Sequence, residues 1–430
     1  MKRAVTLVLA FALLLTLIPS LGLATGKTKL YVYHTDKCQE EYFSLFEQEA
    51  DVEVVPIYVA SEDWAQYMTV AINGGSQIDV MQINGQDVRG YAQKGLLSNL
   101  KETVNYTDRF YPKTYEPFLV DDGLYALPFG DGTSMAMFYN KKIFAEAGLE
   151  VPVTWEDFEH CKNVLNEKGI ALMTHCGATT YMWPSWFFSL FAQATGGNAT
   201  QRTFETLSGK GSFIDQDYIE VMSVLEKLGT EGYFMDGVNA LDRDAAVQAF
   251  VDGKCAIYYS GIWDRGSFRA AGMDEDTLGI FLLPLFCKAA KEGEVYITGA
   301  ASGTALSVYS GSEYQDLALQ MLDFLTSGDR PEKWRFDYAF MPEAVTGSVF
   351  PPYVDFTIPE GLEVDPLDVQ IRELVAHADV WLDWYWPSPV VEAFKEMIQA
   401  VVGGQINAQD AMQTVQDAFE ECVADGYMFS

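Results

Sequence analysis

Tryptophans gather in short aromatic segments of this 430-residue chain, and their flat apolar faces are suited to stacking. A tryptophan face matches the apolar C–H face of a pyranose ring, while the indole N–H can donate a hydrogen bond to a hydroxyl group. The candidates for such contacts are Trp183, Trp186, Trp263, Trp384 and Trp386. For Trp183 and Trp186 the sequence is equally consistent with a place in a hydrophobic core.

Polar side chains that can hydrogen-bond hydroxyl groups form a second set of candidates. Several follow the expected strands 29–33 and 79–83, and ligands of parallel sheets bind beyond the carboxyl ends of the strands. Others follow the expected strand 255–259 or accompany glycines, which allow a ligand to approach the backbone closely. The polar and glycine candidates are Asp36, Asn84, Gln86, Asp87, Asp131, Ser260, Asp264, Gly299 and Ser302. Ordinary loop polarity is the alternative interpretation of each.

The sequence contains no spacing typical of catalysis or of a metal site. HExxH, GxSxG, EF-hand and GxxxxGK[ST] patterns are absent, and four scattered histidines form no triad pattern. A glycosidase needs two carboxylates about 5–9 Å apart, and nothing in the sequence pairs two of the acidic residues. The Tyr258-Tyr259 pair suggests a ferric-ion site only weakly, because no histidine or carboxylate spacing accompanies it. We therefore expect no catalytic residue, metal or cofactor.

The strong negative charge of the chain argues against some classes of binding partner. The formal net charge is −33, with 61 acidic against 28 basic residues. Such a chain repels nucleic acid and anionic membrane surfaces, so neither is expected as a partner. A polyanionic ligand is disfavoured for the same reason, since no cluster of lysines and arginines could receive it.

Six cysteines occur without CxxC or ligand-like spacing. Cys161 and Cys176 are the closest pair in sequence and fall in one expected domain, so a disulfide between them is one interpretation. Buried free thiols are the favoured one.

The N-terminus has the pattern of a secretory signal peptide. Lys2-Arg3 precede an apolar run over 4–18, and the small residues near Ala24 suit a signal peptidase. We expect cleavage after Ala24 and export of the remainder. An uncleaved membrane anchor is the alternative, against which Pro19 and Gly22 argue.

Helix and strand patterns alternate after the signal peptide. Strands are expected at 29–33, 52–57 and 79–83, with helices between them, which predicts a mainly parallel sheet. Further along, a helix is expected over 141–147, stopped by Gly148, and a capping box of Thr154 and Asp157 opens the next helix. The length exceeds what one hydrophobic core usually serves, so two domains are expected.

The run from Tyr125 to Phe158, YALPFGDGTSMAMFYNKKIFAEAGLEVPVTWEDF, carries a resemblance to a known family. Together with Phe250-x-x-Gly253-Lys254, Gly261-x-Trp263 and the closing Gly403-Gly404 between two helices, it resembles the extracellular solute-binding proteins of carbohydrate ABC transporters. These are the maltose-binding-protein-like, family 1 solute-binding proteins. The resemblance covers essentially the whole chain after the signal peptide.

The resemblance implies an α/β, two-lobed periplasmic-binding-protein fold of type II. Proteins with this fold have doubly wound sheets, a ligand cleft between the two lobes, and chain segments that cross between the lobes at a hinge. It places residues 1–24 in the signal peptide. It places 27–130 plus 298–341 in the N-terminal lobe, and 131–297 plus 342–430 in the C-terminal lobe.

The resemblance also implies a function. The protein would capture a sugar, with an oligosaccharide favoured by the many aromatic residues, by hinge closure and deliver it to the permease subunits of an ABC importer. A monomer is expected, periplasmic or associated with the cell surface. A lipobox cysteine is not seen, because Lys27 follows Leu23-Ala24-Thr25-Gly26. The alternatives are a non-sugar solute (peptide, polyamine or phosphate ester) and an exported glycosidase.

Overall fold

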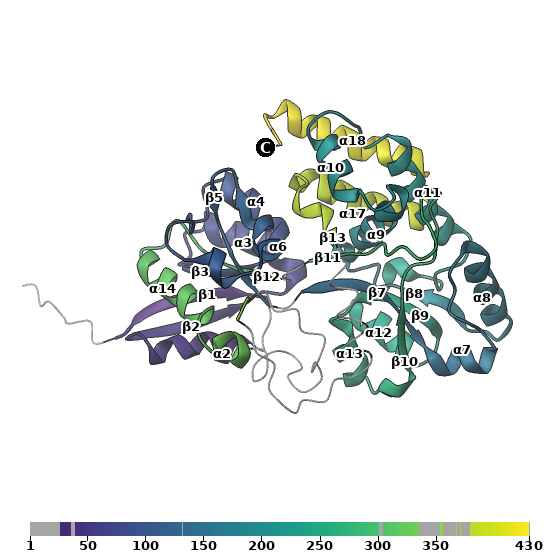
Figure 1. Ribbon diagram of the computed structural model, residues 1–430, viewed down its shortest axis with the longest axis horizontal. Helices are drawn as coiled ribbons and strands as arrows, with labels where there is room; N and C mark the ends of the chain where they lie inside the picture. Colours follow the sequence, from purple (N-terminus) through teal and green to yellow (C-terminus); the bar gives the residue numbers. More distant parts are fainter. Residues whose placement is uncertain are drawn as a thin grey trace, which may run out of the picture.

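The computed structural model describes residues 26–35, 39–130, 132–300, 304–334, 353–355, 367, 370 and 379–429. This part of the chain forms two lobes, each with its own main sheet and its own buried hydrophobic core. Figure 1 shows the first lobe on the left and the second lobe on the right. The expected two-lobed α/β architecture is confirmed.

The sheet of the first lobe has the strand order β2-β1-β3-β12-β6. Strand β1 pairs in parallel with β2 and β3, whereas β12 is antiparallel to both β3 and β6. The strands are β1 (Thr28–His34), β2 (Val52–Tyr58), β3 (Val80–Ile83), β6 (Leu127–Phe129) and β12 (Thr304–Val308). The parallel arrangement predicted for the start of the chain is confirmed.

Helices of the first lobe bury the apolar side chains that recur at helical spacing. Trp64, Met68 and Ala71 share one face of α3 and are buried, whereas Tyr67 beside them is exposed. The α-helices are α2 (Glu40–Ser44), α3 (Trp64–Asn73), α4 (Gly85–Gln93), α5 (Tyr106–Arg109), α6 (Pro112–Tyr115), α14 (Gln315–Leu325) and α15 (Arg330–Lys333). The 3-10 helices are η2 (Leu45–Gln48), η3 (Ser61–Asp63) and η4 (Glu116–Phe118), and a small separate sheet is made by β4 (Leu119–Val120) and β5 (Gly123–Leu124).

The sheet of the second lobe has the order β13-β11-β7-β9-β8, and β10 also pairs with β7. Strand β7 is antiparallel to β9, β10 and β11, whereas β8 pairs with β9 and β13 pairs with β11. The strands are β7 (Thr133–Asn140), β8 (Ala171–Thr174), β9 (Cys255–Gly261), β10 (Leu278–Phe281), β11 (Thr298–Ala300) and β13 (Asp379–Val380).

Helix ends in the second lobe follow the predicted signals. Gly148 ends α7 with a φ of 68°, and the capping box of Thr154 and Asp157 opens α8. The α-helices are α7 (Lys141–Ala147), α8 (Trp155–Glu167), α9 (Trp183–Ala194), α10 (Ala199–Leu207), α11 (Gln216–Thr230), α12 (Arg243–Val251), α13 (Asp264–Ala270), α17 (Ser388–Val402) and α18 (Ala408–Ala424). The 3-10 helices are η5 (Thr180–Met182), η6 (Val238–Ala240), η7 (Glu275–Thr277) and η9 (Leu382–Trp384).

The chain passes between the two sheets near residue 130 and again between β11 and β12. Gly130 has a φ of 89°, a backbone conformation that favours glycine. Strand β11 still belongs to the second sheet, because Gly299 lies opposite Ser134 of β7. The return to the first lobe therefore comes at β12, later than residue 298, where the sequence placed it.

Cysteines in the described part of the chain are unpaired. Cys161, Cys176, Cys255 and Cys287 are buried free thiols, and Cys422 is a partly exposed one. The disulfide considered between Cys161 and Cys176 is therefore not formed, and the favoured interpretation as free thiols is confirmed for these five residues. No helix within the described ranges combines the length and the apolar character needed to cross a membrane.

Candidate functional site

Three tryptophans from two separate segments meet where the two cores come together, and we call them the tryptophan corner: Trp263, Trp381 and Trp384. The ring centroids of Trp263 and Trp381 are 6.0 Å apart and those of Trp381 and Trp384 are 6.2 Å apart, each pair edge to face. Trp381 packs against both hydrophobic cores. The corner is therefore a contact between the lobes, made of surfaces suited to a sugar ring.

Trp384 belongs to the first-lobe side of the corner although its segment leads into α17 of the second lobe. Its ring stacks on Phe118 with centroids 6.0 Å apart, and it is nearly fully buried in the first core. The same ring lies against Gly85, the first residue of α4. A side chain at Gly85 would collide with it, so the glycine permits the two segments to approach.

Trp263 is held on the second-lobe side by the end of β9. Its ring folds over Gly261, where a Cβ would stand 2.2 Å from the indole. The N–H of Ile262 donates to the carbonyl of Ser134 at 3.0 Å, which ties this turn to β7. Trp263 remains partly exposed, so one part of its surface is available for a ligand.

Two carboxylates lie beside the corner. Asp87 is partly buried in the first turn of α4, and burial raises its pKa to about 6. Asp383 lies in η9 with 6% of its surface exposed, and burial raises its pKa to about 7. Burial therefore disfavours the charged form of both carboxyl groups.

Buried polar atoms without a partner point to the same region. In the described part of the chain, Trp381 Nε1, Asp383 Oδ1 and Ser134 Oγ are buried and have no hydrogen-bond partner. Buried polar atoms without a partner are uncommon, and a ligand or an ordered water usually supplies the missing hydrogen bond. Sequence reasoning missed all three residues. The crowding of tryptophans between 381 and 386 was the available signal for Trp381, whereas nothing marked Ser134.

Asp264 and Ser260 form an internal network rather than a free hydrogen-bonding surface. Asp264 is fully buried and accepts a hydrogen bond from Arg243 Nε at 2.7 Å. The hydroxyl of Ser260 donates to the other carboxylate oxygen of Asp264. The carboxylate that the sequence offered as a ligand contact is thus engaged, and its position fixes the start of α13 directly after Trp263.

Like Trp384, three further candidate tryptophans are core residues in this structure. Trp183 and Trp186 in α9 are fully buried, and Trp183 Nε1 donates to the carbonyl of Gly177 at 3.0 Å. Trp386 stacks on Phe394 with centroids 4.1 Å apart. The expectation that these faces are available for a ligand is corrected, because all three side chains are buried in the hydrophobic core of the second lobe.

The remaining candidates are placed as follows. Asn84 immediately precedes α4, and Gln86 lies in its first turn, so both follow the carboxyl end of β3. Gly299 is the middle residue of β11, opposite Ser134. Asp36, Asp131 and Ser302 lie outside the described residues.

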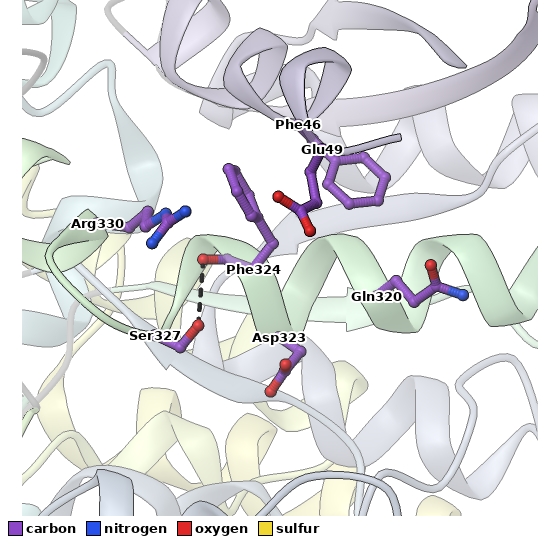
Figure 2. Close-up of a pocket in the computed structure, with 7 residues that line it drawn as sticks. All are labelled: Phe46, Glu49, Gln320, Asp323, Phe324, Ser327 and Arg330. Carbon is purple, nitrogen blue, oxygen red and sulfur yellow. Dashed lines mark hydrogen bonds between the residues drawn. The ribbon is translucent and has the colours of Figure 1, made fainter. Parts of the chain in front are cut away.

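A separate cavity lies on the first lobe, away from the corner. It has a volume of about 290 Å³ and lies between η2 and α14, as Figure 2 shows. The guanidinium of Arg330 lies over the ring of Phe324, 4.4 Å from its centroid. Figure 2 also shows the carboxylates of Glu49 and Asp323 near this opening. The cavity belongs to one lobe only, so closure of the lobes would not enclose it.

Within the described residues no group of three histidine, cysteine or acidic side chains is placed to hold a metal ion. The tryptophan corner offers aromatic faces, indole N–H groups and carboxyl groups. These are the components of a binding site for a hydroxyl-rich ligand.

Comparison with known proteins identifies relatives over most of the chain. The family model described as bacterial extracellular solute-binding protein matches residues 33–329. The maltotriose-binding protein of Pyrococcus abyssi is 27% identical over 333 residues, which cover 74% of this chain and 67% of that protein. A probable sugar-binding periplasmic protein of Brucella melitensis is 23% identical over 235 residues, and there the chain spans about half of the relative, 51% of its length.

Solved structures share the fold at low sequence identity. A chitin oligosaccharide binding protein has a TM-score of 0.76 at 20% identity, covering 93% of this chain and 99% of that one. The GacH receptor of Streptomyces glaucescens has a TM-score of 0.73 at 19% identity, again covering 93% and 99%. These similarities confirm the expected fold class.

Proposed function

Because the chain belongs to the bacterial extracellular solute-binding proteins, we propose that it captures a sugar, specifically an oligosaccharide, between its two lobes. Closure of the lobes excludes water from the sugar and commits it to transport. The protein then delivers the sugar intact to the membrane permease of an ABC importer.

The observation that carries this proposal is the tryptophan corner. Indole surfaces from β9 and η9 meet between the cores, beside buried polar atoms without partners in the described part of the chain. A sugar presents both an apolar ring face and hydroxyl groups, so it satisfies both kinds of surface at once. A polyamine could lie on the aromatic faces through cation–π contacts, but its ammonium groups would offer no acceptor to the indole N–H.

The names of the relatives support a sugar. They include a maltotriose-binding protein, a multiple sugar-binding protein of Streptococcus mutans and a galactooligosaccharide-binding protein of Bacillus subtilis. One solved relative is described in complex with raffinose and another with cycloalternan. We therefore place the ligand among oligosaccharides without choosing a linkage.

The same proposal includes the cellular setting. Residues 1–24 direct export and are removed, and the exported protein acts as a monomer that docks on the permease after closing. The first lobe then comprises residues 27–130 and the segment from β12 to α15. The closing helices α17 and α18 belong to the second lobe. No catalytic step is part of this function.

Thermal melting and tryptophan fluorescence of the protein lacking residues 1–24 test the proposal. The panel contains maltotriose, raffinose, chitin and xylan oligosaccharides, galactooligosaccharides and the matching monosaccharides, with the recovered sugar examined by chromatography. A sugar at one hundred times its Kd stabilises the fold by about 2.7 kcal/mol. A selective rise in melting temperature with intact sugar supports the proposal. Cleavage of the sugar would favour a glycosidase, and the absence of a response to every sugar would favour another solute.

A further inference from the structure

A buried glutamine of the first lobe is hydrogen-bonded at both ends of its amide. Gln82 of β3 is 1% exposed, and its Oε1 accepts a hydrogen bond from the backbone N–H of Thr35 at 3.3 Å. Its Nε2 donates to Oγ1 of Thr304 at 3.3 Å, and the hydroxyl of Thr304 donates to the carbonyl of Phe129 at 2.7 Å. Each of the two side chains both accepts and donates, so the bonds run in one direction from Thr35 to Phe129. We call Gln82 and Thr304 the polar relay.

The polar relay reaches both places where the chain passes between the lobes. Phe129 is the last residue of β6 and directly precedes Gly130, where the chain leaves the first sheet. Thr304 is the first residue of β12, where the chain returns, and it lies opposite Phe129 in the sheet. A Cβ built on Gly130 would stand 3.2 Å from Oγ1 of Thr304, so the two crossing segments lie side by side at this point. Figure 1 shows β11 and β12 where the two lobes adjoin.

The other end of the polar relay lies at the edge of the first sheet where a ligand is expected. Thr35 directly follows β1, which runs parallel to β3, so it lies at the carboxyl ends of these strands. Ligands of parallel sheets bind beyond these ends. Asn84, one of the candidate site residues, follows Gln82 by two positions and precedes α4. The relay therefore connects the expected ligand edge with both crossings through one continuous set of hydrogen bonds.

Core packing alone does not explain a glutamine at this position. All four residues of β3 are buried, and its other three side chains, Val80, Met81 and Ile83, are apolar. An apolar residue in such a strand avoids the cost of removing an amide from water. A buried network of paired polar groups instead holds its members in one arrangement, because moving one of them breaks a bond that water does not replace. The relay is therefore suited to fix both crossings relative to the end of β1.

We propose that Gln82 and Thr304 are positioning residues that restrict the hinge, so that the lobes approach each other in one orientation when they close. Neither side chain needs to touch the sugar for this role. Without the relay, the crossings sample more backbone conformations, and a smaller fraction of the molecules has the lobes oriented for closure. The consequence for sugar capture rests on the proposed function: a smaller competent fraction lowers the apparent affinity in proportion.

The primary test uses the sugar-free protein lacking residues 1–24. Spin labels are attached to Ser76→Cys in the first lobe and Glu167→Cys in the second, both of which are exposed positions. Cys38→Ser and Cys422→Ser confine the labels to these two sites. Pulsed electron paramagnetic resonance then measures the distribution of distances between the lobes. Thr304→Val keeps the shape of the side chain without its hydroxyl group, and it is expected to broaden this distribution.

Two further variants of the polar relay sharpen the test. Gln82→Met keeps the length of the side chain without its amide and is expected to broaden the distribution in the same way. Thr304→Ser keeps the hydroxyl group and is expected to retain the wild-type width. If Thr304→Val does not fold, Gln82→Met decides. Distributions as narrow as that of the wild-type protein in both Thr304→Val and Gln82→Met would overturn the proposal.

Thr326→Val is the matched control for a loss of stability without a loss of positioning. Thr326 is a buried threonine at the end of α14, and its hydroxyl accepts from Arg109 and donates to the carbonyl of Leu322. Thr326→Val and Thr304→Val are both expected to lower the melting temperature by about 2–4 °C, since each leaves buried partners unpaired. Only Thr304→Val is expected to broaden the distance distribution. Equal broadening in the control would overturn the proposal, because general loosening of the first lobe would then explain it.

A second arm separates this proposal from the proposed function. Calorimetry measures the affinity of the wild-type protein and the threonine variants for maltotriose and raffinose. Where either sugar binds, Thr304→Val is expected to bind it about tenfold more weakly, which corresponds to a tenfold smaller competent fraction. Thr304→Ser and Thr326→Val are expected to bind it as the wild-type protein does. Equal affinity in the wild-type protein and Thr304→Val would overturn the positioning role while leaving the proposed function intact. Broadening in Thr304→Val without binding of any oligosaccharide to the wild-type protein would do the reverse.

Discussion

The six-membered ring of Trp384 rests against the backbone of Gly85, and a Cβ built on Gly85 would stand 2.6 Å from that ring. Gly85 begins α4 of the first lobe, whereas Trp384 ends the short helix η9 that leads into the second lobe. This contact between a glycine and an indole holds α4 against the segment that leads into the second lobe, beside the tryptophan corner. Because the ring lies so close to Gly85, adding a single methyl group at this position is expected to change the stability of the fold measurably.

Gly85→Ala is expected to lower the free energy of unfolding by about 1–3 kcal/mol, because the added methyl group forces Trp384 out of its place. Denaturant unfolding measures the change. Gly90→Ala in the same helix is the matched control, since its Cβ would meet only Ser388 Oγ at 3.9 Å. That control is expected to leave stability unchanged or raise it by up to about 1 kcal/mol. Equal stability of the two variants would show that the ring of Trp384 can move away from the added methyl group at no cost in free energy.

Trp263→Ala is expected to weaken sugar binding about 10- to 30-fold, equivalent to about 1.4–2 kcal/mol, because it removes the partly exposed face of the corner. A calorimetric titration with the sugar that responds most strongly in the melting panel measures the loss. Trp155→Ala is the control, since Trp155 lies on α8 and packs against Tyr233 and Phe286. An equal loss in both variants would mean that the effect comes from the fold.

Arg243→Leu is expected to lower the free energy of unfolding by about 3–5 kcal/mol, because the buried carboxylate of Asp264 is left without its charged partner. The loss is read from denaturant unfolding. Lys29→Gln removes the exposed ion pair with Glu53 and is expected to have no measurable effect. A small loss for Arg243→Leu would indicate that water reaches Asp264.

His175 makes the stability of the fold depend on pH. Burial lowers its pKa from 6.5 to about 4. The unfolded chain therefore binds a proton on this residue between pH 4 and 6.5 while the folded protein does not. Stability from this group is present above pH 6.5 and is lost as the pH falls towards 4, by about 3 kcal/mol in all.

His175→Gln is therefore expected to reduce the acid sensitivity of the fold. Melting curves from about pH 4 to 7 measure the slope of stability against pH. His160 lies on α8, where it is exposed, and His160→Gln serves as the control. A wild-type slope in His175→Gln would show that another group causes the loss in acid.

Local signals were sufficient to predict most of the fold. The capping box of Thr154 and Asp157 and the stop at Gly148 are both confirmed, because each depends on residues close together in sequence. The strand β11 was assigned to the other lobe because its partner Ser134 is far away along the chain. Only the three-dimensional pairing shows which sheet a short glycine-containing strand joins.

The candidate site could be predicted only in part, for the same reason. Trp183, Trp186 and Trp263 are alike as residue types, and burial among distant side chains makes the first two core residues. Asp264 looked available because Arg243, its partner, is 21 positions away. Trp381 was not among the predicted site residues, although the nearby Trp384 and Trp386 were. Its position depends on packing against both hydrophobic cores, which the sequence alone does not show.

Calorimetric titration of the exported form of the protein with maltotriose, raffinose and chitin oligosaccharides tests the central claim most directly. We predict one binding site, a negative heat-capacity change from burial of the aromatic faces, and recovery of the sugar uncleaved. The wild-type protein is predicted to become more compact in X-ray scattering when that site is filled. Absence of binding to every oligosaccharide, or binding that is unaffected by Trp263→Ala, would contradict capture at the tryptophan corner.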